Sequence, residues 1–247
     1  MNKKVPHRIS YNTTSVISEI QFWFIISGTI LSFVTMFSID NKLNTSLEIV
    51  ICIISILYFI SEILFSNFFT IAEQQRLDDL IDNSLSSKIA DNNSENYYTN
   101  DDLKQNVTKL GVNGFENAFF TKNISRKMYS KKLPIFLIVI VVYLISIFIM
   151  EKSILVKFFQ LLLPLFIIKE FVQLCLFRSR VEKIFNCYKQ IFSSIKKSDR
   201  EPIIIHNIIA YEKLLSTYNI QLDSKIFNKM NEKLSKEWIQ LKEKYNI

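Results

Sequence analysis

The sequence predicts an all-α membrane protein: four transmembrane helices in two hairpins, both termini in the cytoplasm, and a cytoplasmic helical bundle. The first observation is a set of long apolar runs, which occupy residues 20–39, 49–69, 133–150 and 154–177. About 20 residues at ~1.5 Å rise per residue cross a bilayer core of ~30 Å, so each run is long enough to span. The second observation is that only short segments separate the first run from the second and the third from the fourth. Short connections of this kind are typical of helical hairpins.

The third observation is the placement of positive charge, which sets the orientation of membrane helices. Lys and Arg gather before the first run, before the third and after the fourth, at Lys3, Lys4, Arg8, Arg126, Lys127, Lys131, Lys132, Arg178, Arg180 and Lys183. The two short connections carry only Lys42 and Lys152 as positive residues. Both termini and the middle segment are therefore expected in the cytoplasm. Enrichment in Ile, Lys and Asn is typical of an AT-rich bacterial genome, so the expected location of this multi-pass protein is the bacterial inner membrane.

These patterns divide the chain into five segments. Residues 1–19 are expected to form a cytoplasmic N-terminal arm. Residues 20–70 and 133–177 are expected to form the first and second transmembrane hairpins. Residues 71–132 should hold cytoplasmic helices and a polar loop, and residues 178–247 should form a helical cytoplasmic region.

The cytoplasmic segments show helical patterns. The second apolar run continues to Leu80 without Gly or Pro, which predicts one continuous helix that leaves the membrane. Residues 84–100 are rich in Ser and Asn and predict a loop. Residues 111–132 resume an apolar helical pattern. Behind the fourth run, apolar residues at i, i+3, i+4 and i+7 from 181 to 195 are typical of an amphipathic helix.

Two further helices are expected near the C-terminus. Pro202 suits the first turn of a helix that runs to about Tyr218. Asp223 can cap a last helix. One face of that helix is apolar and carries Phe227, Met230, Leu234, Trp238, Leu241 and Tyr245. Because no segment alternates as a strand, the cytoplasmic part should be a helical bundle.

Composition excludes several kinds of site. The chain has 247 residues, a formal net charge of +7 and only three glycines, and neither a GxGxxG nor a GxxxxGK[ST] phosphate-binding loop can be written. Cys52, Cys175 and Cys187 are isolated in the sequence, and only two histidines occur. These residues provide no zinc spacing and no disulfide framework. No paired acids or nucleophile–base set is present, so we expect no metal, no cofactor and no enzymatic activity.

Two polar stripes run along the first hairpin. Gln21, Gly28, Ser32 and Thr35 share one face of the first run, and the second run carries the corresponding set Ser55, Tyr58, Glu62 and Ser66. Small and hydroxyl residues let membrane helices approach closely, which favours a packing role. The alternative is a water-lined surface in an oligomer, in which these residues are candidates for the wall of a pore.

Charges within the runs are the strongest candidates for function, because charge at hydrocarbon depth is costly. Glu62 follows Ile49 by 13 residues and Lys169 follows Ile154 by 15 residues, so both lie ~20–22 Å below the outer face. The two helices run in the same direction, so these charges could pair across the hairpins. In the alternative, Lys169 snorkels to the interface and only Glu62 needs a partner.

Other residues are candidates for gating or for binding an anion. Pro164 interrupts the fourth run and frees the carbonyl of Gln160, which allows a kink and makes it a gating candidate. The basic clusters offer candidates for an anionic ligand or a lipid headgroup at Arg126, Lys127, Arg178 and Arg180. The positive-inside rule alone would also place these charges there.

Some short stretches match the motifs of a known family. Gln74, Gln75, Leu77 and Asp78 lie where that family has a Gln-Glu-x-Phe-Asp-like stretch, with two of the four residues altered, and Tyr97 and Tyr98 match an aromatic pair. A Gln-Asp-x-Ile motif followed by Arg corresponds to His206, Asn207, Ile209 and Lys213, which are mostly substituted. In layout the chain resembles the four-transmembrane pore-forming effectors of bacterial conflict systems, which are encoded beside nucleotide second-messenger synthases in anti-phage defence loci.

The resemblance implies a function. We expect an inner-membrane effector that oligomerises and permeabilises or depolarises the membrane when it receives a cytoplasmic signal, which stops growth of an infected cell (abortive infection). Its expected partners are membrane lipids, further copies of the chain, and a cyclic nucleotide or a cytoplasmic sensor protein, with no nucleic acid polymer. The alternative is a non-enzymatic membrane scaffold that recruits cytoplasmic partners.

Overall fold

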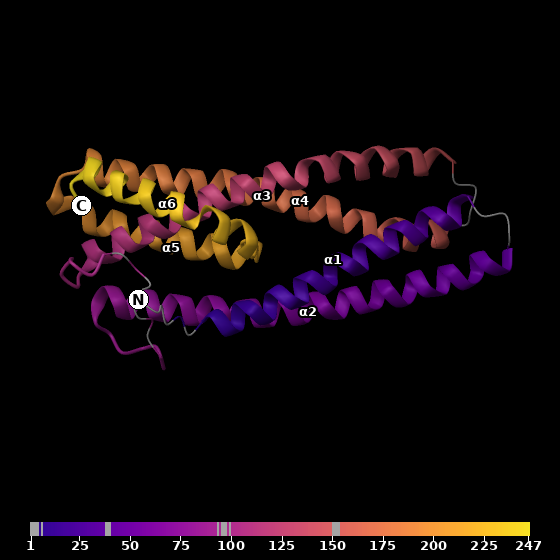
Figure 1. The fold of residues 1–247 in the computed structure, drawn as a ribbon, viewed down its shortest axis with the longest axis horizontal. Helices are drawn as coiled ribbons and strands as arrows, with labels where there is room; N and C mark the ends of the chain where they lie inside the picture. Colours follow the sequence, from indigo (N-terminus) through magenta and orange to yellow (C-terminus); the bar gives the residue numbers. More distant parts are fainter. Residues whose placement is uncertain are drawn as a thin grey trace. The chain divides into compact units, whose positions relative to one another are not determined.

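The structure is a computed structural model, and it describes residues 5, 7–37, 41–92, 94, 98, 100–149 and 154–247. Within this part of the chain the fold is all-helical and contains no strand, so the predicted fold class is confirmed at that level. The α-helices are α1 Arg8–Phe37, α2 Asn41–Leu85, α3 Val107–Ile149, α4 Ile154–Ser193, α5 Arg200–Tyr218 and α6 Ser224–Tyr245 (Figure 1).

The first four helices are long: α1 has 30 residues, α2 45, α3 43 and α4 40. α2 is continuous over 45 residues, as the absence of Gly and Pro predicts. α3 covers 43 residues and joins the predicted cytoplasmic helix to the third apolar run. Pro134 lies inside α3, where its ring nitrogen carries no N–H to donate to the preceding turn.

The helices contribute to two compact units. The first, here called the bundle unit, contains Met1–Tyr11, Phe69–Tyr129 and Leu174–Ile247. The second, here called the apolar unit, contains Asn12–Phe68 and Ser130–Gln173. Each of the first four helices therefore supplies residues to both units.

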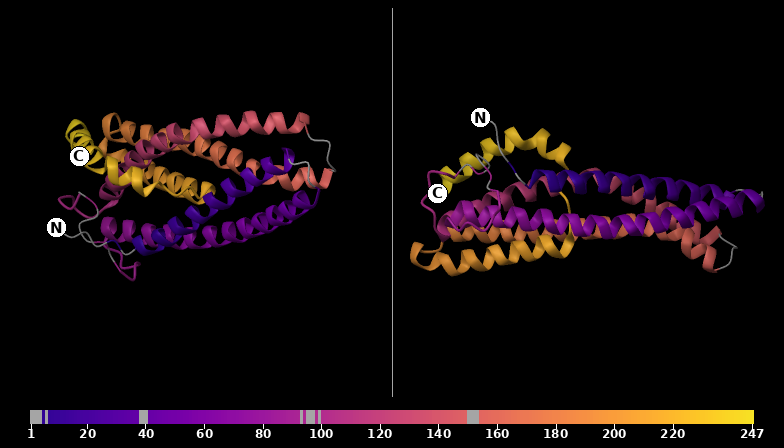
Figure 2. Two further views of the ribbon diagram at one scale, coloured as in Figure 1. Left: turned by 45° about the vertical axis from the view of Figure 1, so that its right-hand side comes forward. Right: turned by 90° about the horizontal axis from the view of Figure 1, so that it is seen from below.

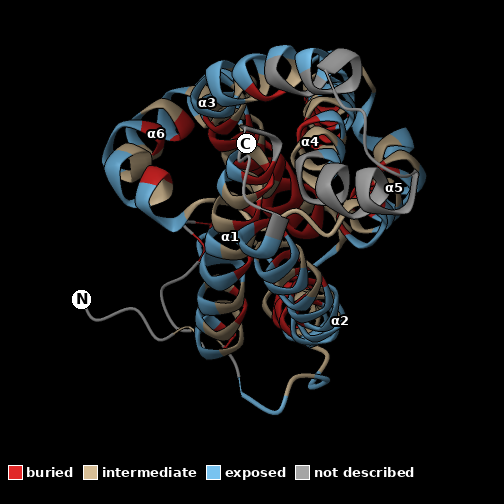
Figure 3. Cartoon of the chain, turned by 90° about the vertical axis from the view of Figure 1, so that its right-hand side faces the viewer, coloured by how far each residue is buried: buried red, intermediate tan, exposed pale blue. Residues whose placement is uncertain are grey.

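The apolar unit has a small interior and a large apolar exterior. Ile25, Ile51 and Tyr58 are buried in one cluster, against which Phe166 and Ile167 of α4 also pack. Helices α1 and α2 lie side by side (Figures 1 and 2). Exposed residues follow the outward sides of both helices (Figure 3). Many are large and apolar, including Val16, Phe22, Trp23, Ile30, Ile53, Ile56, Phe59, Ile60 and Ile63.

Two helices are long and apolar enough to cross a membrane among the residues that the structure describes. They cover Arg8–Thr35 and Lys42–Leu85. In the most apolar stretch of 18 residues, only 22% of the first helix and 28% of the second are buried, whereas a core helix of a soluble protein would be mostly buried. These helices are compatible with a membrane protein, and the spans at 133–150 and 154–177 stay predictions.

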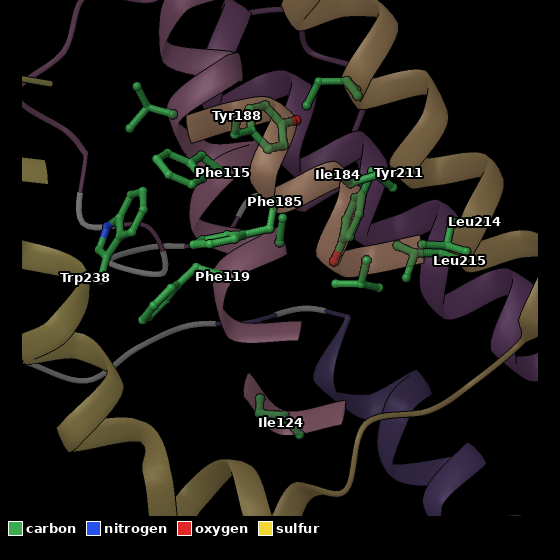
Figure 4. Close-up of a cluster of buried hydrophobic side chains, with 14 of the residues drawn as sticks. Phe115, Phe119, Ile124, Ile184, Phe185, Tyr188, Tyr211, Leu214, Leu215 and Trp238 are labelled. Atoms are coloured by element: carbon green, nitrogen blue, oxygen red, sulfur yellow. The ribbon is translucent and has the colours of Figure 1, made fainter. Parts of the chain in front are cut away.

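The bundle unit has a conventional hydrophobic core. Phe115 of α3 lies at its centre, with ring centroids 5.4 Å from Phe185, 5.6 Å from Tyr188 and 5.3 Å from Trp238 (Figure 4). A Cβ atom on Gly114 would lie 2.3 Å from the Tyr188 hydroxyl, so a glycine is needed where α3 approaches α4. α3 and α4 lie side by side here (Figure 2).

The C-terminal helices form as their sequence patterns predict. Pro202 occupies the first turn of α5. The Asp223 side chain caps α6 by accepting a hydrogen bond from the Ile226 N–H at 3.0 Å. The predicted apolar face of α6 packs onto the core through Phe227, Met230, Leu234, Trp238, Leu241 and Tyr245.

Candidate functional site

A polar cluster joins three helices of the apolar unit at Glu62. Lys169 Nζ of α4 lies 3.6 Å from Glu62 Oε1 of α2. The Gln21 amide of α1 donates a hydrogen bond to Glu62 Oε2 at 2.9 Å. Both carboxylate oxygens therefore have a partner, and the pairing of Glu62 with Lys169 is the arrangement that the structure contains. We call Gln21, Glu62 and Lys169 the Glu62 cluster.

The Glu62 cluster has aromatic neighbours, and its two charged side chains are also partly exposed at the surface of the unit. Tyr58 and Phe166 pack beside it with ring centroids 4.5 Å apart, and Lys169 Nζ lies 5.8 Å from the centroid of the Phe166 ring. The side chains of Glu62 and Lys169 are nevertheless 40% and 48% exposed. A charged pair therefore reaches the surface of a unit whose exposed residues are largely apolar.

The predicted stripe residues lie inside the apolar unit. Gly28, Ser32 and Thr35 of α1 are buried, and so is Ser55 of α2, while Ser66 is half-buried. The hydroxyls bond to carbonyls of their own helices: Ser32 to Gly28 at 2.7 Å, Thr35 to Ser32 at 2.9 Å and Ser55 to Ile51 at 2.8 Å. Burial within one copy fits the packing role, and the water-lined role in an oligomer stays a prediction.

Two other predicted candidates are placed only in part. Pro164 lies within α4, but its side chain lies outside the described residues, and so its role in a kink stays a prediction. Tyr97 also lies outside the described residues. Its neighbour Tyr98 is buried in the core of the bundle unit.

The basic candidates all belong to the bundle unit. Arg126 and Lys127 are exposed on α3. The Arg178 guanidinium lies 4.2 Å from the ring centroid of Tyr129, and that of exposed Arg180 lies 5.4 Å from the ring centroid of Tyr218. Stacking on aromatic rings orients the guanidinium groups without neutralising them.

The motif residues Gln74 and Asp78 contact each other on α2. The Gln74 amide donates to Asp78 Oδ1 at 2.7 Å, across one turn on the exposed side of the helix. Arg76, which lies between them in the sequence, points the other way and is buried.

Arg76 is at the centre of an ionic network that the sequence analysis missed. Its Nε donates to Glu73 Oε2 at 2.8 Å, and its Nη2 contacts the carboxylate of Glu212 on α5. The Tyr11 hydroxyl of α1 donates to Glu73 Oε1 at 2.5 Å. We call Tyr11, Glu73, Arg76 and Glu212 the Arg76 network. The i, i+3 spacing of Glu73 and Arg76 was the one local signal that could have indicated it.

Burial changes the protonation equilibria in and beside the Arg76 network. Burial raises the pKa of the Glu212 carboxyl, although the charge of Arg76 opposes this effect. His7 Nδ1 lies 3.9 Å from Asp79 Oδ2 in the same unit. Burial lowers the pKa of His7, with Asp79 opposing. The network thus holds charges that are costly to leave without partners.

A second buried polar network also escaped the sequence analysis. The Asn100 amide donates to Asn113 Oδ1 at 2.8 Å and to Glu116 Oε2 at 2.7 Å. The Asn113 amide donates to Asn83 Oδ1 at 2.9 Å and to Ser84 Oγ at 3.0 Å. These bonds fasten the end of α2 and the following connection to α3, which is a structural role.

No group of three or more His, Cys, Asp and Glu side chains that could hold a metal ion occurs in the part of the chain described. No protein-family model matches the chain, and no similar curated protein or solved structure was found.

Proposed function

We propose that the chain is an inner-membrane effector with four spans and cytoplasmic termini, which oligomerises and permeabilises the membrane on receiving a cytoplasmic signal. The observation that carries this proposal is the Glu62 cluster, a half-exposed ion pair between two apolar runs, in a unit whose exposed residues are largely apolar. The proposed setting, anti-phage defence, rests on the resemblance of the layout to defence effectors.

The exposed residues of the apolar unit support its insertion into lipid. Soluble proteins rarely expose contiguous apolar patches of more than a few hundred Å². Here large apolar side chains are exposed on α1 and α2, and those of the third proposed span are Ile135, Leu137, Ile138, Val141, Leu144 and Ile145. Hydrocarbon would remove all of this surface from water.

The Glu62 cluster supports oligomerisation. A charged pair exposed to hydrocarbon is costly, so its open side should face water or polar groups of another copy. Four helices in one chain are too few to enclose a wide pore. Several copies with their Glu62 clusters turned inward would keep the charged pairs out of hydrocarbon. The same copies together would supply enough helices to enclose a path for ions.

The grouping of chain segments supports the proposed topology. The bundle unit contains the N-terminal segment, the middle segment and the C-terminal region, which the distribution of Lys and Arg assigns to the cytoplasm. A signal such as a cyclic nucleotide or a sensor protein would act on this unit, which continues directly into all four proposed spans.

The proposal is tested by reconstituting the full chain in lipid vesicles and measuring dye release and ion flux, with chemical cross-linking to count copies. Glu62→Gln is expected to leave assembly intact and to change ion selectivity, because it removes the charge and keeps the shape. Glu170→Gln is the matched control, since Glu170 pairs with Lys132 at 3.3 Å in the same unit. Full membrane insertion without any flux, in vesicles and in cells that hold the signal, would favour the scaffold instead.

A further inference from the structure

The Arg76 network connects segments that are far apart along the chain. Tyr11 precedes the first apolar run, Glu73 and Arg76 follow the second, and Glu212 belongs to α5. All of them lie in the bundle unit. The network therefore fastens the ends of α1 and α2 to α5, on the stretches where both helices leave the apolar unit.

Neighbouring contacts strengthen the same attachment. The Gln221 amide, just beyond α5, donates to the backbone carbonyl of Tyr11 at 2.8 Å. The Ser10 hydroxyl donates to Gln75 Oε1 at 2.8 Å, between α1 and α2. The contact of His7 with Asp79 lies in the same region.

The charge balance makes Arg76 the group on which the attachment depends. One guanidinium stands between the carboxylates of Glu73 and Glu212, so its removal would leave two like charges in a poorly solvated place. Arg76 Nη1 and Glu212 Oε1 are buried and have no hydrogen-bond partner among the described residues.

We propose that Arg76 is a latch: its bridge between Glu73 and Glu212 holds the ends of α1 and α2 on α5, and release of these ends requires the Arg76–Glu212 contact to break. This inference rests on the proposed function, because release would be the step through which the signal reaches the membrane helices. The contact with Glu73 is local to α2 and persists in the released state.

A cleavable cross-link tests the latch in the full chain. Arg76→Cys and Glu212→Cys are combined in a chain whose Cys52, Cys175 and Cys187 are replaced by Ala. The two thiols are joined by a reagent that a reductant cleaves. The matched control joins Lys122→Cys to Glu182→Cys, positions whose native ion pair of 3.5 Å links α3 to α4 in the same unit.

Two readouts separate the latch from the proposed function: amide hydrogen exchange over residues 8–11, and dye release from vesicles. Cleavage at the Arg76–Glu212 pair should speed exchange over residues 8–11 several-fold and increase dye release, with no change in the control pair. Faster exchange without dye release would support the latch and overturn permeabilisation. Unchanged exchange, with cross-linking and cleavage complete, would overturn the latch.

A second variant covers the case in which the double substitution does not fold. Glu212→Gln keeps the side-chain shape and removes the charge that holds Arg76 on α5. It should speed exchange over residues 8–11 relative to the unmodified chain, whereas Glu182→Gln should not. Equal exchange rates in the two single variants would also overturn the latch.

Discussion

Gln21 of α1 and Glu62 of α2 are joined by a hydrogen bond of 2.9 Å from the Gln21 amide to Glu62 Oε2. The other carboxylate oxygen faces Lys169 of α4. One acidic side chain in the second apolar run thus holds together three helices of the apolar unit, and its two partners differ in charge. This difference allows the contribution of each partner to be measured.

The Glu62–Lys169 pair should show strong coupling in a double-mutant cycle. Glu62→Ala and Lys169→Ala should each destabilise the apolar unit, because each leaves one charge without its partner. The loss is ~3–5 kcal/mol for a fully buried pair and smaller here, since both side chains are about half exposed. The double variant should recover much of the loss, measured by unfolding in detergent. Additive losses would show that the two charges are independent. The same double-mutant cycle on the second ion pair of the unit, with Lys132→Ala and Glu170→Ala, is the comparison.

The proposed topology predicts which positions a membrane-impermeant thiol reagent can reach. In a chain without its native cysteines, Asn44→Cys should be labelled from outside intact cells. Ala90→Cys and Gln240→Cys should be labelled only after the membrane is opened. Labelling of either position from outside would contradict cytoplasmic placement of the bundle unit.

The two glycines of α3 should respond differently to alanine. On Gly114 a Cβ would lie 2.3 Å from the Tyr188 hydroxyl and 2.4 Å from Ile208 Cδ1, and both side chains belong to the core. Overpacking of this kind costs ~1–3 kcal/mol. On Gly111 a Cβ would lie 2.8 Å from Ile204 Cδ1 and 3.0 Å from its Cγ1 and Cγ2, so one buried core side chain would have to shift. Thermal unfolding should therefore show a loss for both variants, and a larger one for Gly114→Ala, where the contacts are closer and involve two side chains.

Acidification should destabilise the bundle unit through His7. Burial lowers the pKa of His7 below its ordinary value of ~6.5, despite the opposing charge of Asp79. The unfolded chain then binds a proton near pH 6.5 that the folded chain does not, so the free energy of unfolding falls as pH drops from 7 toward the lowered pKa. The slope from one such group is at most ~1.4 kcal/mol per pH unit.

The pH effect has a direct control. His7→Phe should flatten the dependence of the unfolding free energy on pH between about 7 and 5.5, because the titrating group is gone. His206→Asn changes the other histidine, which is exposed on α5, and should leave the dependence as it is. An unaltered slope in His7→Phe would assign the effect to other groups.

Local patterns in the sequence determined the helices themselves. The continuity of α2, the first-turn position of Pro202, the Asp223 cap and the apolar face of α6 all follow from residues within a few positions of one another. Hydropathy predicted four spans, and two of the corresponding helices are long and apolar enough to cross a membrane among the described residues. Helical periodicity and capping are properties of neighbouring residues, and so one sequence is enough to predict them.

Tertiary structure decided which polar side chains meet. Gln21 and Glu62 are 41 positions apart, and Arg76 and Glu212 are 136 apart. Position along the span allowed Glu62 to pair with Lys169, but it did not single out Gln21 as the second partner. Arg76 carried no sign that it would be buried, because the α2 sequence around it is polar. Its burial results from the packing of α1, α2 and α5 in one unit, and helix packing depends on side chains from distant segments that local patterns do not specify.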